Sequence, residues 1–296
     1  MNTKYYKNKD GFYMTHNAIA HREEEYDSAG FNMLLQMQED HFWYRGRHKF
    51  LLYSLKKHLA KKNKGSPQTN PSSSLKAIDL GGGCGGWVKY LCRNAPTLFS
   101  EVALGDSSLS ALEKANVVLG PTNNLFHIDL MNLEFEEEWD VLFLLDVLEH
   151  LPDDKGALEQ AMKALKPGGL IFITVPALDA FWSFNDEVAS HLRRYSLEML
   201  KNLSKSVGLK VVDSRYFMFF LSPIYWLTRK FSGGNKLSKE KQKESVHKAH
   251  QIPFWPINQT LSSIFCFETP IGHYVRFLWG TSALVILKKP SMAGNE

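Results

Sequence analysis

The 296-residue sequence predicts an α/β fold, in which helices cover both faces of a largely parallel sheet. Between residues 75 and about 213, short apolar runs alternate with stretches typical of helices. Four of the runs end in an acidic residue, and the first leads into a glycine-rich turn. Open sheets of this class bind ligands at the carboxyl ends of their strands, so these acids are expected to share one edge.

The N-terminal 60 residues are expected to form an arm and a helical cap. Residues 1–30 are polar and aromatic, whereas residues 31–60 place apolar side chains at mixed helical spacing and predict a helix. Residues 61–74, KKNKGSPQTNPSSS, have the composition of a loop and are predicted to be mobile. The main domain is then expected to span residues 75–296.

The most informative segment is AIDLGGGCGG, residues 77–86. It predicts a buried strand at 75–80 that turns sharply into a helix beginning near Trp87. Glycine is needed where the backbone takes a positive φ or where a ligand approaches within contact distance. A glycine turn between a strand and a helix N-terminus is typical of nucleotide-type sites, so the segment predicts a nucleoside-containing cofactor.

Two cofactor templates fit this turn. Gly81, Gly83 and Gly86 match the G-x-G-x-x-G pattern of dinucleotide sites, which favours NAD. Preceded by Asp79, the turn also matches D-x-G-x-G-x-G. An acid would repel a pyrophosphate, whereas S-adenosylmethionine (SAM) carries an ammonium and a sulfonium that a carboxylate attracts. The acid therefore favours SAM, and an NAD-dependent oxidoreductase stays as the alternative.

The second predicted strand, residues 101–106, ends in Asp106. As a carboxylate, this side chain is placed to accept hydrogen bonds from both hydroxyls of a ribose. A helix is predicted at 108–119, with Ser107 or Ser108 as its N-cap. This strand therefore adds a second acid to the expected edge of the sheet.

The third and fourth strands continue the pattern. Residues 124–130 predict a strand carrying Asp129, which can accept from an adenine amino group, and residues 139–145 predict the strand before Asp146. The remaining expected elements are a strand closing the segment 165–176, a helix at 197–206, a strand at 207–217, an insertion at 222–268 with a disordered Lys-rich stretch at 232–250, and a last strand at 282–288.

Five motifs carry a resemblance to a known family: DLGGGCGG (79–86), GDSS (105–108), HIDL (127–130), LLDVLEHLPDD (144–154) and LKPGGLIFITVP (165–176). The chain resembles the class I SAM-dependent methyltransferases, in particular bacterial small-molecule enzymes of types 11 and 23. The resemblance implies a Rossmann-like seven-stranded sheet with an antiparallel last strand, SAM as cofactor and S-adenosylhomocysteine as product. The cofactor-binding residues that it implies are Arg47, Asp79, Gly81, Gly83, Asp106, Ser107, Asp129, Leu130 and Asp146.

The segment HFWYRGR, residues 41–47, precedes the glycine turn. Similar enzymes place an N-terminal helix over the cofactor, and some use an arginine from it to pair with the SAM carboxylate. Arg47 is the expected partner, with Arg45 in reserve, while Trp43 or Tyr44 would cover the methionine end or stack on substrate. The alternative is an amphipathic helix with aromatic core contacts and surface arginines.

The segments FWSFND (181–186) and HLRRYS (191–196) follow the fifth strand. They resemble the LWSxxD…GHxRRYS pattern of bacterial small-molecule methyltransferases, with Phe181 in place of leucine and Ser190 in place of glycine. The resemblance implies His191 as a general base and Asp186 as the group that orients it. Substrate contacts are expected from Trp182, Arg193, Arg194 and Tyr195, the two arginines taking an anionic group. The alternative is a structural ion-pair network that closes the loop.

His150 is a further catalytic candidate, because it follows the fourth strand where this class lines the methyl-transfer channel. Glu149 and His150 also suit the start of a helix, where acids are favourable, and this structural interpretation is preferred. The segment 216–226, YFMFFLSPIYW, is interpreted as core packing, with a substrate lid or a foot on a membrane surface as the alternative.

Composition limits the partners. A net charge of +4 without a basic stripe argues against nucleic acid. The three cysteines form no C-x-x-C, so no metal site is expected, and reduced thiols favour the cytoplasm. The first residues have no apolar core of a signal peptide, and no run of about 20 apolar residues could span a membrane. The oligomeric state stays open.

The sequence therefore predicts a SAM-dependent methyltransferase that modifies an oxygen or nitrogen of a small, anionic or hydrophobic metabolite in a biosynthetic pathway. Enzymes of the same fold can use SAM for aminocarboxypropyl transfer or cyclisation, which is the alternative chemistry. A non-catalytic binding protein is disfavoured by the complete glycine turn.

Overall fold

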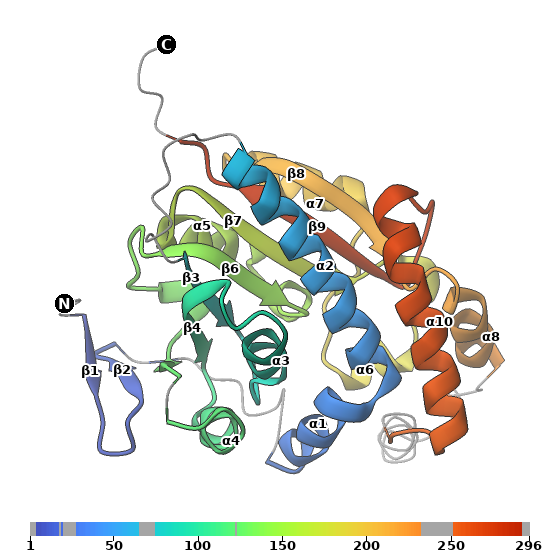
Figure 1. Cartoon of the computed structure of the whole chain (residues 1–296), viewed down its shortest axis with the longest axis horizontal. Helices are drawn as coiled ribbons and strands as arrows, with labels where there is room; N and C mark the ends of the chain where they lie inside the picture. The colour runs from blue at the N-terminus through green and yellow to red at the C-terminus, as the bar shows by residue number, and fades with distance from the viewer. Residues whose placement is uncertain are drawn as a thin grey trace.

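The computed structural model describes residues 4–17, 19, 28–64, 75–121, 123–231 and 251–291, and its centre is one twisted sheet (Figure 1). The strands are β1 (Tyr5–Lys7), β2 (Tyr13–Thr15), β3 (Leu75–Leu80), β4 (Phe99–Asp106), β5 (Leu125–His127), β6 (Trp139–Leu145), β7 (Leu165–Pro176), β8 (Lys210–Phe217) and β9 (Ser282–Lys288). The α-helices are α1 (Ser28–Asp40), α2 (Phe42–Lys64), α3 (Gly86–Asn94), α4 (Leu109–Leu119), α5 (Asp154–Ala164), α6 (Phe184–Val188), α7 (Leu197–Ser206), α8 (Ser222–Phe231) and α10 (Trp255–Tyr274). Short 3-10 helices are η1 (Leu130–Asn132), η2 (Leu148–His150) and η3 (Asp179–Phe181).

The described sheet has nine strands in the order β1-β2-β5-β4-β3-β6-β7-β9-β8. The strands from β2 to β7 are parallel, and β9 runs antiparallel to both β7 and β8, as expected for the last strand. The expected count of seven was wrong, because residues 5–15 form a hairpin that extends the edge beyond β5. Aromatic packing fixes this hairpin: the ring of Tyr13 stacks on Phe126 at 4.7 Å, and Phe12 is buried.

The predicted helix at 31–60 is two helices, α1 and α2, separated at His41. Asn258 of α10 satisfies both ends of this break, because its amide accepts from the backbone of Phe42 at 2.9 Å and donates to the carbonyl of Asp40 at 2.8 Å. The break therefore depends on a residue more than 200 positions away, and no local sequence signal marks it.

Several expected boundaries also shift. Helix α2 continues to Lys64, so the expected loop at 61–74 begins four residues late, and residues 65–74 lie outside the described residues. The third predicted strand, 124–130, is β5 alone, because Asp129 instead caps η1. The insertion contains α8 and α10, the latter ending at Tyr274, while the stretch 232–250 is also outside the described residues.

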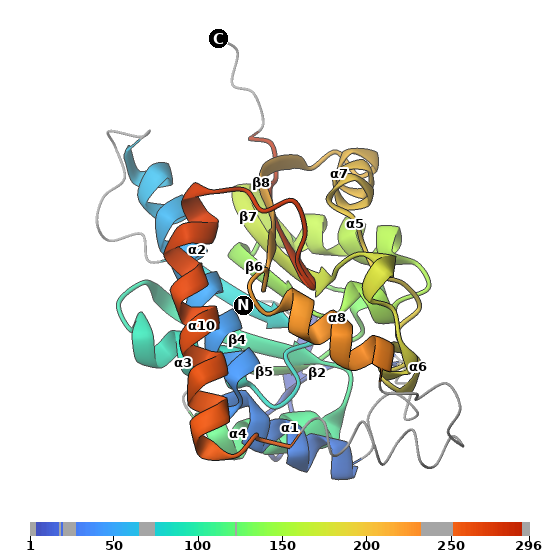
Figure 2. The same cartoon turned by 90° about the vertical axis from the view of Figure 1, so that its right-hand side faces the viewer.

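Helices cover both faces of the sheet because the central strands are apolar on both sides. In β6, Leu142 and Leu144 face the cluster formed with α5 and α7, whereas Val141 and Phe143 face the cluster formed with α2, α3 and α10. Figure 2 shows α10 running beside α2 on the second face. A strand buried on both faces reads as a continuous apolar run, which is why the sequence predicts β6 well.

The segment 216–226 divides between core and surface. Phe217 and Met218 are buried against α2 and α10, which confirms packing for the first part. Ile224, Trp226 and Leu227 of α8 are exposed. Among the helices in the described ranges, none combines the length and the apolar character needed to cross a bilayer.

Helices α2 and α10 approach closely at Gly46, where an added Cβ would overlap the ring of Phe265. We therefore expect Gly46→Ala to lower the free energy of unfolding by about 1–3 kcal/mol, because overpacking a well-filled contact forces side chains out of their rotamers. Chemical denaturation would measure the loss. Combination with Phe265→Leu should recover part of it, and strict additivity of the two changes would contradict the steric explanation.

Candidate functional site

The glycine turn after β3 takes the backbone conformation that the sequence predicts. Gly81 and Gly83 have φ of +74° and +55°, and Gly81 donates its N–H to the carbonyl of Gly105 at 2.7 Å. A Cβ on Gly81 would come within 2.7 Å of the Val147 side chain. Side chains are therefore excluded here both by φ and by space, and α3 begins at Gly86 as expected.

Helix α1 lies over this turn as a cap. The side chain of Gln38 accepts a hydrogen bond from the Gly86 N–H at 3.0 Å, at the N-terminus of α3. Leu34 lies 3.4 Å from the position of a Cβ on Gly83. Gln38 therefore satisfies one of the donors that a helix N-terminus leaves without an intrahelical partner. The sequence did not single out Gln38, because nothing local distinguishes it from any polar helix residue.

Asp106 and Asp129 reach the same edge but also hold the backbone. Asp106 accepts from the N–H groups of Gly83 and Ser108, both at 2.9 Å, which joins the glycine turn to the start of α4. Ser108 is the N-cap of α4, one of the two expected candidates. Asp129 accepts from the Met131 N–H at 2.9 Å. Their roles toward ribose and adenine stay predictions.

Ser107 and Leu130 flank these two acids. The carbonyl of Ser107 lies 3.0 Å from Nε2 of the His127 ring, a contact between the β4 and β5 ends. Leu130 opens η1 directly after Asp129 and is only partly buried. Both residues expected to contact the cofactor therefore lie at the carboxyl edge of the sheet, beyond the ends of the neighbouring strands β4 and β5.

Asp79 is the least satisfied of the acids. It is 2% exposed, and its Oδ1 has no hydrogen-bond partner among the residues described. Burial raises its pKa to about 8; Arg47 opposes this shift, whereas the negative charges of Asp106 and Asp146 add to it. The carboxyl therefore faces two like charges in a place that water barely reaches, an environment that favours an added cation.

Arg47 projects from α2 into this group of acids. It is 5% exposed and forms an ion pair with Asp146, whose other oxygen accepts from the Thr174 hydroxyl at 3.2 Å. The guanidinium carbon lies 4.7 Å from the Trp43 ring centroid and 5.0 Å from that of Tyr44. Trp43 and Tyr44 thus cover the arginine, and the expected partner of a SAM carboxylate is held here by an acid of the chain itself.

The titration of Asp79 carries a stability prediction. Its native pKa of about 8 lies above its ordinary value of 3.8, so between these values the native state keeps a proton that the unfolded chain releases. Stability from this group is fully present at low pH and is lost as pH rises, by about 1.4 kcal/mol per pH unit. We expect Asp79→Asn to flatten the pH profile of unfolding free energy in this range. Urea denaturation of both proteins across it tests this, and parallel profiles would contradict it.

Asp186, predicted to orient a base, is the centre of an ion-pair network. Its carboxylate is 1% exposed and contacts His191 Nδ1 at 3.0 Å, Arg194 at 2.8 Å and Arg229 of α8 at 3.0 Å. Burial would raise its pKa, but the His191 hydrogen bond and the charges of Arg194 and Arg229 outweigh burial and hold the pKa at about 2. Asp186 also closes a capping box with Ser183 at the start of α6.

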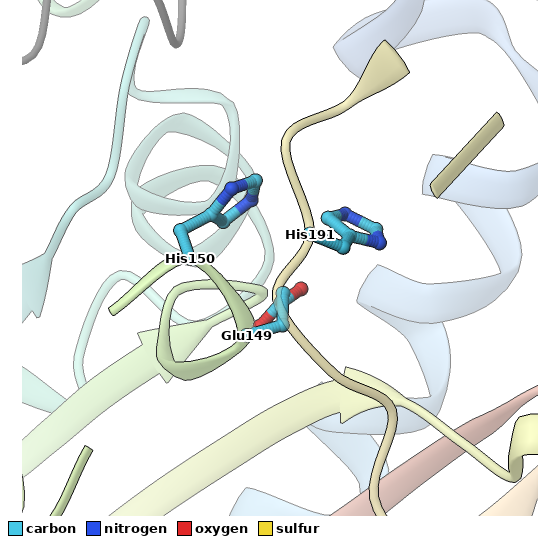
Figure 3. Close-up of side chains that lie close together, drawn as sticks. All are labelled: Glu149, His150 and His191. Atoms are coloured by element: carbon cyan, nitrogen blue, oxygen red, sulfur yellow. The ribbon is translucent and has the colours of Figure 1, made fainter. Parts of the chain in front are cut away.

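Glu149 and His150 lie beside this network (Figure 3). The Glu149 side chain is completely buried, and burial together with the charge of Asp146 raises its pKa well above the ordinary value. The rings of His150 and His191 meet edge to face, with centroids 4.9 Å apart. Burial and the charge of His191 lower the pKa of His150 to about 4, so His150 is neutral near pH 7.

The other four residues expected to contact substrate differ in burial and in their partners. Arg194 is 3% exposed and engaged with Asp186, and Tyr195 is buried and donates to Asp154 at 2.8 Å, as in the structural alternative. Arg193 also pairs with Asp154, at 2.9 Å, while Trp182 is exposed.

Sequence reasoning missed Arg229 and read Glu149 only as a helix-start residue. Arg229 comes from α8, 43 positions after Asp186, so no spacing rule connects the two. Glu149 stands next to His150 in the motif LLDVLEHLPDD. An acid at that position after a buried strand was the sequence feature that could have identified Glu149 as a site residue.

Two curated methyltransferases share part of this sequence. A ubiquinone biosynthesis O-methyltransferase from Brucella anthropi is 29% identical over 140 residues, which cover 44% of this chain and 54% of that protein. A sterol 24-C-methyltransferase from Debaryomyces hansenii is 25% identical over 159 residues, which cover 47% of this chain and 41% of that protein. The chain thus spans about half the length of the curated relatives it matches.

The fold comparison agrees. Phosphoethanolamine N-methyltransferase 2 of Haemonchus contortus, solved in complex with SAM, shares the fold with a TM-score of 0.55 at 16% identity, over 94% of this chain and 62% of that one. The family model described as "Methyltransferase domain" matches residues 18–214, well over half of the chain. With the glycine turn, the acids on the strand ends and the antiparallel β9 in place, the chain belongs to the methyltransferase-domain family of class I SAM-dependent methyltransferases.

Proposed function

We propose that this protein transfers a methyl group from SAM to an oxygen or nitrogen of a small metabolite. The observation that carries the proposal is the buried, unpartnered oxygen of Asp79 beside the Arg47–Asp146 pair, directly before the glycine turn. Such a group costs free energy unless a ligand satisfies it. The family membership supports the same conclusion.

The residues around the turn fit SAM in charge and shape. Asp146 offers a negative charge to an ammonium and Asp79 offers an oxygen that has no partner among the described residues. Arg47 can exchange Asp146 for a carboxylate and form two parallel hydrogen bonds with it. Gly81 leaves the backbone open to a ligand where a Cβ would already meet Val147. Asp106 would accept from the ribose hydroxyls. These residues suit an amino-acid group joined to a nucleoside better than a pyrophosphate.

Methyl transfer requires mainly that the protein aligns the acceptor atom with the methyl group. SAM supplies an electrophilic methyl group on a sulfonium. The chain has to hold the acceptor atom about 3–3.5 Å from that carbon, in line with the bond that breaks. In this proposal His191 accepts the proton of an acceptor hydroxyl through Nε2, because Asp186 holds the Nδ1 side of the ring at 3.0 Å.

The substrate class follows from the surroundings. Arg193, partly exposed and paired with Asp154, could exchange this partner for an anionic group of the acceptor. The exposed apolar side chains of α8, together with Phe254 and Trp255 at the start of α10, favour a hydrophobic portion. The relatives are a ubiquinone biosynthesis O-methyltransferase and a sterol 24-C-methyltransferase, which is consistent with an apolar acceptor. A cytoplasmic location is part of the proposal.

Calorimetric titration with SAM, S-adenosylhomocysteine and NAD tests the cofactor. We expect binding of the first two and none of NAD; binding of NAD alone would overturn the proposal. Product analysis then separates the two SAM chemistries, since methyl transfer leaves S-adenosylhomocysteine, whereas aminocarboxypropyl transfer leaves methylthioadenosine. Methylthioadenosine as the product would favour that alternative.

A further inference from the structure

Glu149, His150 and His191 bring three metal-binding side chains to one point. One carboxylate oxygen and one nitrogen from each imidazole all lie within 4.8 Å of one another. Figure 3 shows the two histidines on facing segments, with Glu149 between them. Glu149 and His150 belong to η2, and His191 lies in the segment between α6 and α7. Donor atoms around a tetrahedral ion with bond lengths of about 2.0–2.2 Å stand about 3.3–3.6 Å apart, so small side-chain rotations would bring these three onto one ion.

The donor atoms are poorly satisfied by the chain. Glu149 is completely buried, and neither carboxylate oxygen hydrogen-bonds to another of the described residues. His150 Nδ1 is likewise buried without a hydrogen-bond partner in the described part of the chain. A buried polar group costs about 1–3 kcal/mol when it is left unsatisfied, so two adjacent ones favour the binding of a ligand at this point.

The surrounding hydrogen bonds prepare His191 as a ligand. Asp186 accepts from Nδ1 at 3.0 Å, which leaves the lone pair on Nε2. A ligating histidine is commonly held in this way by a carboxylate on its other nitrogen. The two segments are also tied by their backbones, because the Leu192 N–H donates to the Glu149 carbonyl at 2.8 Å. The two segments that carry the ligands are therefore held together independently of an ion.

We propose that Glu149, His150 and His191 form a binding site for a divalent first-row transition ion, of which Zn²⁺ is the natural probe. Two imidazoles with one carboxylate suit Zn²⁺ or Fe²⁺, whereas Mg²⁺ and Ca²⁺ prefer oxygen ligands. Three protein ligands leave one coordination position open to water or to a substrate oxygen. The cysteines could not have indicated the site, since none of the three takes part.

The site bears on the proposed function without depending on it. A nitrogen that ligates an ion has no lone pair left for a proton, so His191 can serve as the general base only while the site holds no ion. SAM binding at Asp79 and Asp106 is measured separately from metal binding. Failure of the metal site would leave the base role of His191 intact, and failure of SAM binding would leave the metal site intact.

The test uses the full chain, purified without a metal-affinity tag and stripped with a chelator. Calorimetry with Zn²⁺ and elemental analysis after dialysis should give one ion per chain, and Co²⁺ should give the visible absorption of a bound ion. Mg²⁺ should give neither heat nor retention. Failure of the unaltered protein to bind Zn²⁺ would overturn the proposal without any variant.

Variants then locate the ion. Glu149→Gln and His150→Gln should each lower Zn²⁺ affinity by more than about 100-fold, since loss of even an outer-shell partner costs about 10–100-fold. His191→Gln gives an independent third measurement. His16→Gln, at an exposed histidine, is the matched control and should leave affinity unchanged. Thermal melting of the metal-free proteins shows which variants are folded, and unchanged affinity in folded cluster variants would overturn the assignment.

Discussion

Replacing Asp186 with alanine is expected to lower the free energy of unfolding by about 3–5 kcal/mol, because it leaves buried cations without their counter-charge. Arg194 is 3% exposed and has Asp186 as its acidic partner, and Arg229 and His191 share the same carboxylate. The capping box with Ser183 at the start of α6 would be lost as well. Urea denaturation followed by circular dichroism measures the effect.

Glu187 supplies the matched control for Asp186. It is the next residue in the same short helix, but it is exposed. Glu187→Ala should change stability by less than about 0.5 kcal/mol, as surface substitutions usually do. Similar losses for the two variants would contradict the view that the buried network, rather than the helix itself, holds this segment. Asp186→Asn keeps the shape and isolates the contribution of charge.

Replacing Asp106 with alanine is expected to lower SAM affinity by about 100-fold or more. In the proposed complex its carboxylate accepts two ribose hydroxyls, and hydrogen bonds to a charged group contribute about 1.5–3 kcal/mol each. Losing two of them corresponds to a factor of at least about 100 in the dissociation constant. Calorimetry with SAM and S-adenosylhomocysteine would measure it, and unchanged affinity would remove the cofactor assignment of Asp106.

Ser108→Ala separates cofactor binding from the local fold around Asp106. Ser108 caps α4 two residues further on, accepting from the Ala111 N–H at 3.3 Å. Its removal should cost about 1 kcal/mol of stability and leave SAM affinity within a small factor of the original. If both variants lose affinity to the same degree, the loss reports the start of α4 and not a contact with ribose.

The central sheet could be predicted because its signals are local. The strand before the glycine turn, the strand ending in Asp106 and the fully apolar β6 each show their period and their boundary within a few residues. The hairpin at residues 5–15 could not be predicted in this way. Its strands have three residues each, and β2 finds its partner β5 more than 100 positions later in the chain.

In the candidate site, too, residues with a local sequence signal could be predicted and long-range contacts could not. Asp79, Gly81 and Asp106 follow from the strand-and-turn pattern, and the structure places them at one edge. The partners of Asp186 do not follow, since Arg229 arrives from α8 and the burial of Arg194 depends on the packing of the whole loop. Sequence patterns identify site residues that lie within one segment. Contacts between residues of distant segments depend on tertiary packing, which the local sequence does not show.

The place of β9 in the sheet affects how the chain can fold as it is made. β9 lies between β7 and β8, and the pairing of β8 within the described sheet is with β9. While residues 282–288 are still inside the ribosome, β7 has an open edge from Leu170 to Pro176, and β8 lacks the partner that it has in the described sheet. An open edge can template pairing with another chain. The nascent protein therefore carries an aggregation hazard that ends only when its last strand emerges, although most of the sheet is already synthesised by then.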